Sequence, residues 1–279
     1  MIPDWQTNQI YLSKRFEANE RFKENYNKIN SVLNSNGTSP KLLPDTNDIW
    51  ARDYMPIQIN ENTFIEYRFD PDYLQKTRKG YRDTKTYPDL VCTSIGLKTT
   101  KSDIIMDGGN LVKSANCIIL TEKIVKENSL KYSKKELIKK LHETFQVEKV
   151  VLIPQDKQER YGHSDGMVRF IDNETVVTQY YFKGYSAMLK PLQQAGLKIE
   201  YINYDVKKKD NKRNWAYLNF LQTNDLILLP KFGIDEDDQA LEQIKDFYPD
   251  YRNSIAQVEM NDIVDYHGAL NCISWTTME

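Results

Sequence analysis

Cysteine and histidine are scarce in this sequence of 279 residues, which contains three of each. Three cysteines cannot all pair with one another, and no CxxC or Cys/His spacing typical of a metal site occurs. The composition therefore predicts reduced thiols, as in a cytoplasmic protein, and shows no set of metal ligands.

Long apolar runs and an excess of one charge are also missing. Runs such as residues 226–229 are far shorter than the roughly 20 residues of a membrane-spanning helix, and the N-terminal MIPDW lacks the basic-then-apolar order of a signal peptide. Basic residues number 38 and acidic residues 40, a net charge of −2, so we expect no binding to membranes or nucleic acids. The one basic cluster, residues 207–209 with Lys212 and Arg213, is interpreted as a solvated loop.

Short polar clusters recur along the chain at nearly constant spacing. Their central residues are Asp53, Asp107, His163, Asn219 and Cys272, and the successive gaps are 54, 56, 56 and 53 residues. Such a period is typical of a repeat architecture in which one position per repeat faces a shared axis. Two acids, an imidazole, an amide and a thiol would then meet, which are the parts of a nucleophilic site for a cationic substrate.

The segments between these clusters read alike. Three clusters precede a β-hairpin around an Asn or Asp turn, then a helical pattern, then one more strand. The hairpin strands are expected at 111–112 and 117–120, 167–171 and 175–178, and 220–221 and 226–229. The helices are expected at 133–145 (with a capping box at Ser133 and Glu136), 187–195 and 237–248, and the last strands at 150–153, 198–201 and 255–258.

The two chain ends are predicted to share a unit. The first cluster precedes a hairpin at 57–60 and 63–67, and residues 70–88 read as a loop insertion that is a candidate lid. A strand at 9–12 and a helix at 16–33 would complete a unit whose polar cluster lies at 267–275. The sequence thus predicts an α/β ring of five ββαβ units, with residues 1–279 forming one domain.

Cys272 is a candidate nucleophile because it occupies the position where other units place Asp or Asn. Its alternative is a buried core cysteine, the interpretation that we also give to Cys92 and Cys117. His163 suits acid/base chemistry because an extended His-x-Asp segment would put His163 and Asp165 on one face. A structural pair and a metal ligand are its alternatives.

The other polar residues are weaker candidates when taken alone. Asp53 and Asp107 would each be interpreted as turn residues if they did not share the phase of the repeat. His267 is a loop residue near the predicted site. His142 is expected at the surface or boundary of a helix.

Four short segments carry the polar residues: NDIWARDY at 47–54, DGGN at 107–110, GHSD at 162–165 and NCIS at 271–274. Together these segments resemble the agmatine deiminase and bacterial peptidylarginine deiminase family. Further matches are Pro3-x-Trp5, residues 217–220 and residues 235–243, so the resemblance covers nearly the whole chain.

The resemblance implies a pseudo-fivefold α/β propeller, the fold of the guanidine-modifying superfamily, and a hydrolase that needs neither a metal nor an organic cofactor. It implies that the substrate is a small cationic guanidine, with agmatine converted to N-carbamoylputrescine, and a homo-oligomer is compatible with it. The implied catalytic residues are the nucleophile Cys272, the general acid/base His163 and its orienting partner Asp107. The implied substrate-binding residues are Asp53, Asp165, Trp50 and Asn219.

Departures from the family pattern leave the substrate open. The chain is shorter than typical agmatine deiminases, and Met55 stands where a glycine is common. Peptidyl-arginine or another small guanidine is the alternative within the class. An amidinotransferase, a catalytically inactive guanidine-binding module and a metallohydrolase are the alternatives outside it.

Overall fold

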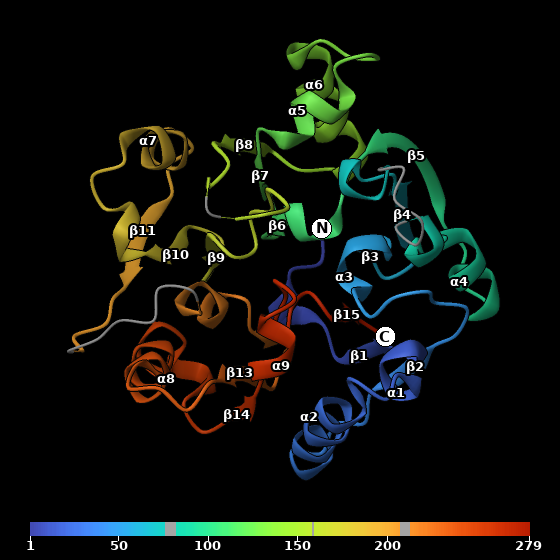
Figure 1. The fold of residues 1–279 in the computed structure, drawn as a ribbon. Coiled ribbons are helices and arrows are strands. Elements are labelled where there is room, and N and C mark those ends of the chain that lie inside the picture. The colour runs from blue at the N-terminus through green and yellow to red at the C-terminus, as the bar shows by residue number, and fades with distance from the viewer. Residues whose placement is uncertain (76–81, 158, 207–212) are drawn as a thin grey trace.

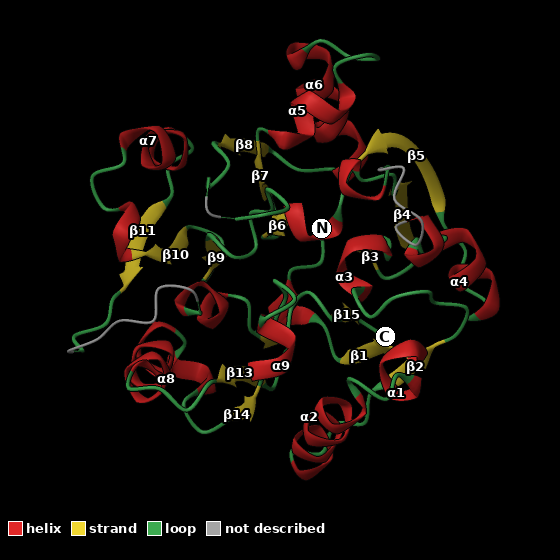
Figure 2. Ribbon diagram, in the orientation of Figure 1, coloured by secondary structure: helices red, strands yellow, loops and turns green. Residues whose placement is uncertain are grey.

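The computed structural model describes residues 1–75, 82–157, 159–206 and 213–279. Within these ranges the strands form five small sheets around a common centre, and the longer helices lie toward the outer side of the ring (Figures 1 and 2). The prediction of a pseudo-fivefold α/β propeller is confirmed.

Each sheet has three strands. One edge strand runs antiparallel to the middle strand, and the other edge strand runs parallel to it. In sequence order from the N-terminus, the sheets are β15 (Ser274–Thr277), β1 (Gln9–Ser13) and β2 (Lys41–Leu43); β3 (Ile57–Asn60), β4 (Thr63–Arg68) and β5 (Thr100–Ile105); β6 (Val112–Lys113), β7 (Cys117–Thr121) and β8 (Lys149–Ile153); β9 (Val168–Phe170), β10 (Thr175–Gln179) and β11 (Lys198–Ile202); and β12 (Leu221–Gln222), β13 (Ile227–Lys231) and β14 (Ile255–Glu259).

Helices connect the middle strand of each sheet to the parallel strand, because parallel neighbours need a crossover. The α-helices are α1 (Lys14–Ala18), α2 (Lys23–Ser35), α3 (Ala51–Tyr54), α4 (Pro88–Ser94), α5 (Lys123–Asn128), α6 (Lys134–Phe145), α7 (Ser186–Gln194), α8 (Glu236–Phe247) and α9 (Asn261–Val264). The 3-10 helices are η1 (Asp4–Gln6), η2 (Asp72–Leu74), η3 (Arg82–Thr84), η4 (Gly108–Asn110), η5 (Tyr180–Phe182), η6 (Asn214–Leu218) and η7 (Pro249–Tyr251).

The two chain ends meet in one sheet. Strands β1 and β15 pair antiparallel, with Gln9 opposite Thr277 and Leu12 opposite Ser274. The unit predicted to be shared between the ends is confirmed, and this pairing closes the ring.

Several expected elements differ from the structure. The helix expected at 16–33 is two helices, because the chain turns at Asn19, whose side-chain oxygen accepts from the Arg21 backbone N–H. Strand β5 and helix α4 had no prediction. Of the insertion at 70–88, η2 and η3 are described, while residues 76–81 lie outside the described residues, as do residues 207–209 and Lys212 of the basic cluster.

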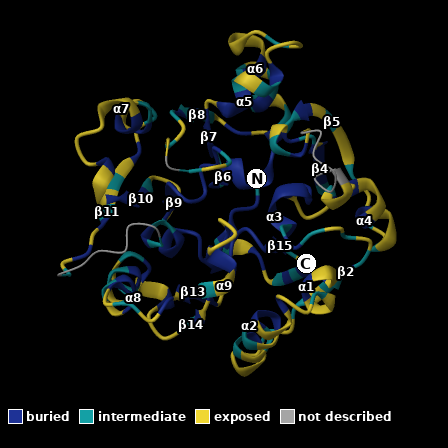
Figure 3. Ribbon diagram, viewed as in Figure 1, coloured by how far each residue is buried: buried dark blue, intermediate teal, exposed yellow. Residues whose placement is uncertain are grey.

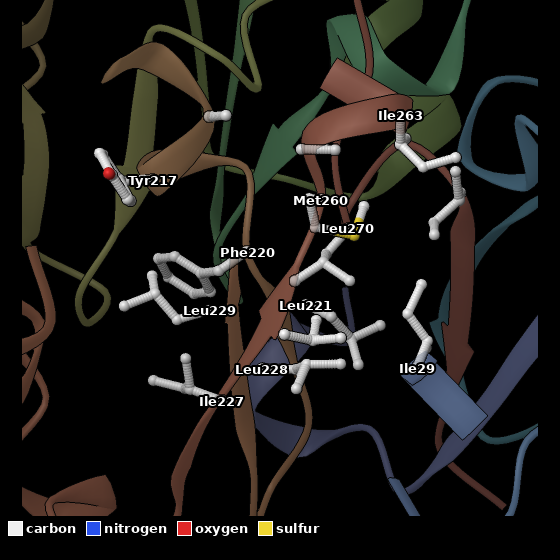
Figure 4. Packing of buried hydrophobic residues seen from close by; sticks show 14 of the residues in the cluster. Ile29, Tyr217, Phe220, Leu221, Ile227, Leu228, Leu229, Met260, Ile263 and Leu270 are labelled. Atoms are coloured by element: carbon white, nitrogen blue, oxygen red, sulfur yellow. The ribbon is translucent and has the colours of Figure 1, made fainter. Parts of the chain in front are cut away.

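The degree of burial depends on the distance from the centre of the ring. The chain near the centre is buried, whereas the outer helices carry most of the exposed residues (Figure 3). The largest of three apolar clusters joins the last sheet to the N-terminal helices, as Ile29, Leu228 and Ile263 illustrate in Figure 4. Each sheet thus buries apolar side chains against its neighbours, which fixes the inner strands that follow the central polar groups.

Smaller predictions can also be compared with the structure. Ser133 and Glu136 form the capping box at the start of α6, and Cys92 and Cys117 are buried core residues whose pKa is raised to about 12 by burial. His142 lies partly buried on α6 beside the Val147 carbonyl. Along the stretches that the structure describes, every helix is too short or too polar to cross a bilayer.

Candidate functional site

The repeated polar residues occupy equivalent places, immediately before the five inner strands of the ring. Asp53 lies in α3 before β3, Asp107 directly before η4 and β6, and His163, Asn219 and Cys272 in the loops before β9, β12 and β15. All are nine-tenths buried or more. The repeat therefore brings one polar group from each sheet toward one end of the central axis.

The imidazole of His163 lies between two carboxylates. Its Nε2–H donates to Asp107 Oδ2 at 3.0 Å, and its Nδ1 is 3.8 Å from Asp53 Oδ1. Burial alone would lower the pKa of His163, but the charges of Asp53 and Asp107 outweigh it and raise the pKa to about 10. The imidazole is therefore a cation at neutral pH.

The two carboxylates differ in charge state because their surroundings differ. Burial raises the pKa of Asp107, but the hydrogen bond from His163 and the charge of Lys123 outweigh this and hold the pKa below its usual value. Burial raises the pKa of Asp53 to about 7, although His163 opposes the shift. A bound cation would favour the ionised form of Asp53.

The thiol of Cys272 faces oxygen acceptors. Its Sγ lies 3.2 Å from Asn219 Oδ1 and 3.6 Å from Asp165 Oδ2, and the Cys272 backbone N–H also donates to Asn219 Oδ1. Burial, followed by the charges of Asp165 and Asp53, raises the pKa of the thiol well above its usual value. In the absence of a ligand the thiol is therefore protonated.

Gly109 joins the imidazole to the thiol side of the site. Its N–H donates to Asp53 Oδ1 at 3.0 Å, and its carbonyl accepts from the Asp165 N–H at 3.2 Å. A Cβ at this position would lie 2.7 Å from both Asp53 Oδ1 and His163 Nδ1. Only glycine lets the backbone approach these two side chains so closely.

Trp50 lies beside the loop that carries the thiol. A Cβ on Gly268 would lie 2.0 Å from the ring atom Cζ3 of Trp50, so the indole packs directly over the Gly268 backbone. The Trp50 backbone N–H donates to Asp48 Oδ1 at 2.9 Å, which begins the short helix α3. The structure thus brings all seven predicted residues into one set, while their chemical roles remain predictions.

The backbone around His163 differs from the expectation. Residues 163–165 are not a continuous extended segment, since a turn begins at Ser164, whose carbonyl accepts from the Met167 and Val168 N–H groups. This turn directs His163 toward Asp107 and Asp165 toward Cys272.

Three residues of the site had no predicted role. Lys123 contacts Asp107, and Asn271 Nδ2 donates to Asp165 Oδ2 at 2.8 Å while its Oδ1 accepts from Arg169. Asn271 is the neighbour of Cys272 within a motif, a signal that could have identified it. Lys123 and Arg169 lie in a helix and a strand with no local signal, because their partners are distant in sequence.

A cleft of about 910 Å³ borders the site. Its lining includes Glu159, which accepts from the His163 backbone N–H, and Gly166, which follows Asp165. His267 also lines it, and its ring lies 6.2 Å from that of Tyr161. The cleft is therefore lined by neighbours of His163 and Asp165 and not by the predicted site residues themselves. Among the described residues, no group of three or more His, Cys, Asp or Glu is arranged to hold a metal ion.

Comparison with known proteins adds a family match. The model of the Porphyromonas-type peptidyl-arginine deiminase family matches residues 16–277. A protein of Enterococcus faecalis named "Putative agmatine deiminase" is 26% identical over 275 residues, covering 82% of this chain and 74% of its own length.

Solved structures share the fold at low sequence identity. A variant of C. jejuni agmatine deiminase with substrate bound has a TM-score of 0.79 at 17% identity and covers 100% of this chain and 96% of its own. A mutant of DDAH from Pseudomonas aeruginosa complexed with citrulline has a TM-score of 0.59 at 12% identity, with 97% and 99% covered.

Proposed function

Because the chain belongs to the Porphyromonas-type peptidyl-arginine deiminase family, and is a hydrolase of C–N bonds in linear amidines, we propose that it converts agmatine and water to N-carbamoylputrescine and ammonia. In this proposal residues 1–279 act as one catalytic domain. The observation that carries it is that the Cys272 thiol and the His163 imidazole lie in one buried site and each contacts carboxylates, Asp165 for the thiol and Asp53 and Asp107 for the imidazole.

The acids provide the binding site for the guanidinium. Asp53 and Asp165 come from different sheets and are joined through Gly109, so they can grip the planar cation from two directions with charge-assisted hydrogen bonds. Trp50 flanks the plane of the group. Among the described residues, Asn219 Nδ2 is buried without a hydrogen-bond partner, so it can donate to the ligand.

The first half of the reaction forms a covalent intermediate. The bound cation lowers the pKa of Cys272, and the thiolate attacks the guanidinium carbon, so that an S–C bond forms. His163 then gives its proton to one amino group, the C–N bond breaks, and ammonia leaves. A cationic thiouronium remains on Cys272, and the imidazole is neutral.

The second half releases the product. Neutral His163 takes a proton from water, the hydroxide adds to the thiouronium carbon, and the S–C bond breaks to give the ureido group. The hydroxyl proton of the adduct returns to sulfur, and the proton first released from the thiol converts ammonia to ammonium. Enzyme charge and atoms are restored after each turnover.

Peptidyl-arginine is the second candidate substrate, and the cleft favours it. A volume of about 910 Å³ is at the upper end for a small-ligand site, and Tyr180, Tyr181 and Trp215 add aromatic surface to its lining. Such a surface suits the main chain and side chains next to an arginine.

The test is a comparison of three guanidines. Agmatine, free arginine and a blocked arginyl peptide are each incubated with the protein, with and without a chelator, and ammonia and ureido product are measured. We expect turnover of agmatine above the other two, no effect of the chelator, and a loss of more than about 1,000-fold in Cys272→Ala. Cys117→Ala is the matched control, because Cys117 is buried away from the site.

The outcomes separate the hypotheses. Turnover of the peptide alone would replace agmatine by peptidyl-arginine, and no ureido product from any of the three would overturn the deiminase proposal. Activity that survives in Cys272→Ala would overturn the mechanism.

A further inference from the structure

Lys123 is a buried cation that the proposed mechanism does not use. It begins helix α5, and it is 3% exposed. Its Nζ contacts Asp107 Oδ2, lies 2.9 Å from Glu127 Oε1 and 3.8 Å from Asp72 Oδ1, and sits 5.4 Å above the ring of Tyr73. A lysine is rarely buried so completely unless its charge is paired, so its place requires an explanation.

The contact between Lys123 and Asp107 explains why this lysine is buried. The oxygen that Lys123 contacts, Oδ2, is the same oxygen that accepts the Nε2–H of His163 at 3.0 Å. The other oxygen, Oδ1, is buried without a hydrogen-bond partner among the described residues. A single carboxylate oxygen is therefore held between two cations, and its position relative to the imidazole depends on both.

From this geometry we infer that Lys123 is a positioning residue, which fixes the Asp107 carboxylate and limits how strongly Asp107 retains the proton on His163. The inference rests on the proposed acid/base role of His163. Without Lys123, the full charge of Asp107 would act on the imidazolium, and His163 would release its proton to the leaving group less readily.

Glu127 acts in the opposite direction. It is on the same helix, pairs with Lys123, and has a pKa raised to about 7 by burial and then by the charge of Asp107. Its negative charge draws Lys123 away from Asp107. The chain of charges runs from Glu127 through Lys123 and Asp107 to His163, and alternates in sign at each step.

Other charged or titratable groups face this chain and stay constant in the test. Asp53 faces His163 from α3, and Asp72 faces Lys123 from η2. The rings of Tyr73 and Tyr161 lie 6.5 and 5.9 Å from the imidazole, and Glu159 binds the His163 backbone N–H. The substitutions below leave all of these residues in the chain, and only Asp72 and Tyr73 lose a contact with Lys123.

The test is an NMR titration of the imidazoles, which needs no substrate. The sequence contains three histidines, so the signal of His163 can be assigned by its loss in His163→Asn. We expect Lys123→Met to raise the pKa of His163 by about one unit, and Glu127→Gln to lower it by about half a unit. Lys123→Arg should restore most of the wild-type value, because it keeps the charge.

Lys126→Met is the matched control, since Lys126 is an exposed lysine of the same helix. It should leave the pKa of His163 and the turnover unchanged. In parallel, kcat should fall about tenfold in Lys123→Met, and the alkaline limb of its pH profile should move to higher pH. A purely structural lysine would lower the melting temperature without moving the imidazole titration.

The result that overturns the inference is an unchanged His163 pKa in Lys123→Met, or shifts of the same sign in Lys123→Met and Glu127→Gln. If Lys123→Met does not fold, Glu127→Gln decides alone, because it keeps the buried cation. A wild-type protein that turns over no guanidine would overturn the proposed function, whereas opposite shifts in the two variants would still support the electrostatic chain.

Discussion

The imidazole side and the thiol side of the site are buried to the same degree and both face carboxylates, but they carry different charges. His163 is 5% exposed and Cys272 is 6% exposed. The charges of Asp53 and Asp107 keep the imidazole of His163 protonated and cationic, whereas burial and the charges of Asp165 and Asp53 keep the thiol of Cys272 protonated and neutral. Negative surroundings thus favour the charged form of one group and the neutral form of the other.

The difference explains how a site with several acids can contain a cysteine nucleophile. Carboxylates that would suppress a thiolate in the empty site attract a cation, and the cation then provides the positive charge that the thiol lacks. The nucleophile is thus activated by the ligand that it attacks. In the empty site the thiol is comparatively protected from reaction with other electrophiles.

Asp165→Asn is expected to change the difference between the imidazole side and the thiol side most strongly. It keeps the shape of the side chain but removes the negative charge beside the sulfur. We expect kcat/KM to fall about 1,000-fold, roughly 4 kcal/mol, because the guanidinium loses a buried ionic partner. The alkylation rate of Cys272 by a neutral reagent at pH 8 should rise, since Asp165 raises the pKa of the thiol. A fall in both rates would contradict the comparison.

Gly109→Ala is expected to have the next largest effect, because Gly109 connects the two sides. The added Cβ would push Asp53 and His163 apart from their present positions. We expect kcat to fall about 100-fold, as misplacement by about 1 Å does in other enzymes. Unchanged activity with an unchanged melting temperature would show that the two sides are not coupled through this backbone.

The pH dependence should show the two sides separately. In the free enzyme Asp53 ionises near pH 7 and His163 loses its proton near pH 10. We therefore expect kcat/KM to rise about tenfold per unit up to pH 7, and to fall above about pH 10. In Asp53→Asn the acid limb should disappear and the alkaline limb should move to lower pH, because Asp53 raises the pKa of His163.

The smallest effect is expected far from both sides. Ser133→Ala removes the capping box of α6, which should lower the free energy of unfolding by about 1 kcal/mol. The kcat/KM should stay unchanged, and so should the alkylation rate of Cys272. A change in either rate would show that the stability of the outer helix α6 affects the reactivity of the site.

The parts of the fold that follow local rules were predictable from the sequence. The turns at Asn116 and Asn173, the alternation of short apolar runs and the spacing of the polar clusters were sufficient to predict the hairpins, the closed ring and the set of polar residues that meet. The seven candidate site residues could also be selected from the sequence, because each lies in or beside a short motif, and their chemical roles stay predictions.

The remaining features depend on individual side-chain contacts. The break between α1 and α2 comes from the Asn19 side chain, whose oxygen accepts from the Arg21 backbone N–H, a local bond that competes with the helical pattern around it. Lys123 resembles an ordinary helix residue, and its role becomes visible only when Asp107, which precedes strand β6 of the same sheet, lies against it. A single sequence contains no signal for such a contact.

The pairing of β1 with β15 has a consequence for measuring the protein. Cys272 lies directly before β15, so it is shielded when that strand is held by β1. Cys92 is buried in helix α4 and Cys117 in strand β7 of another sheet. A thiol reagent applied at rising denaturant would therefore label Cys272 as the ring opens, and its rate relative to the other two would tell whether the ring opens at its seam before the sheets unfold. The same sulfur that serves as the proposed nucleophile would then act as a reporter of closure.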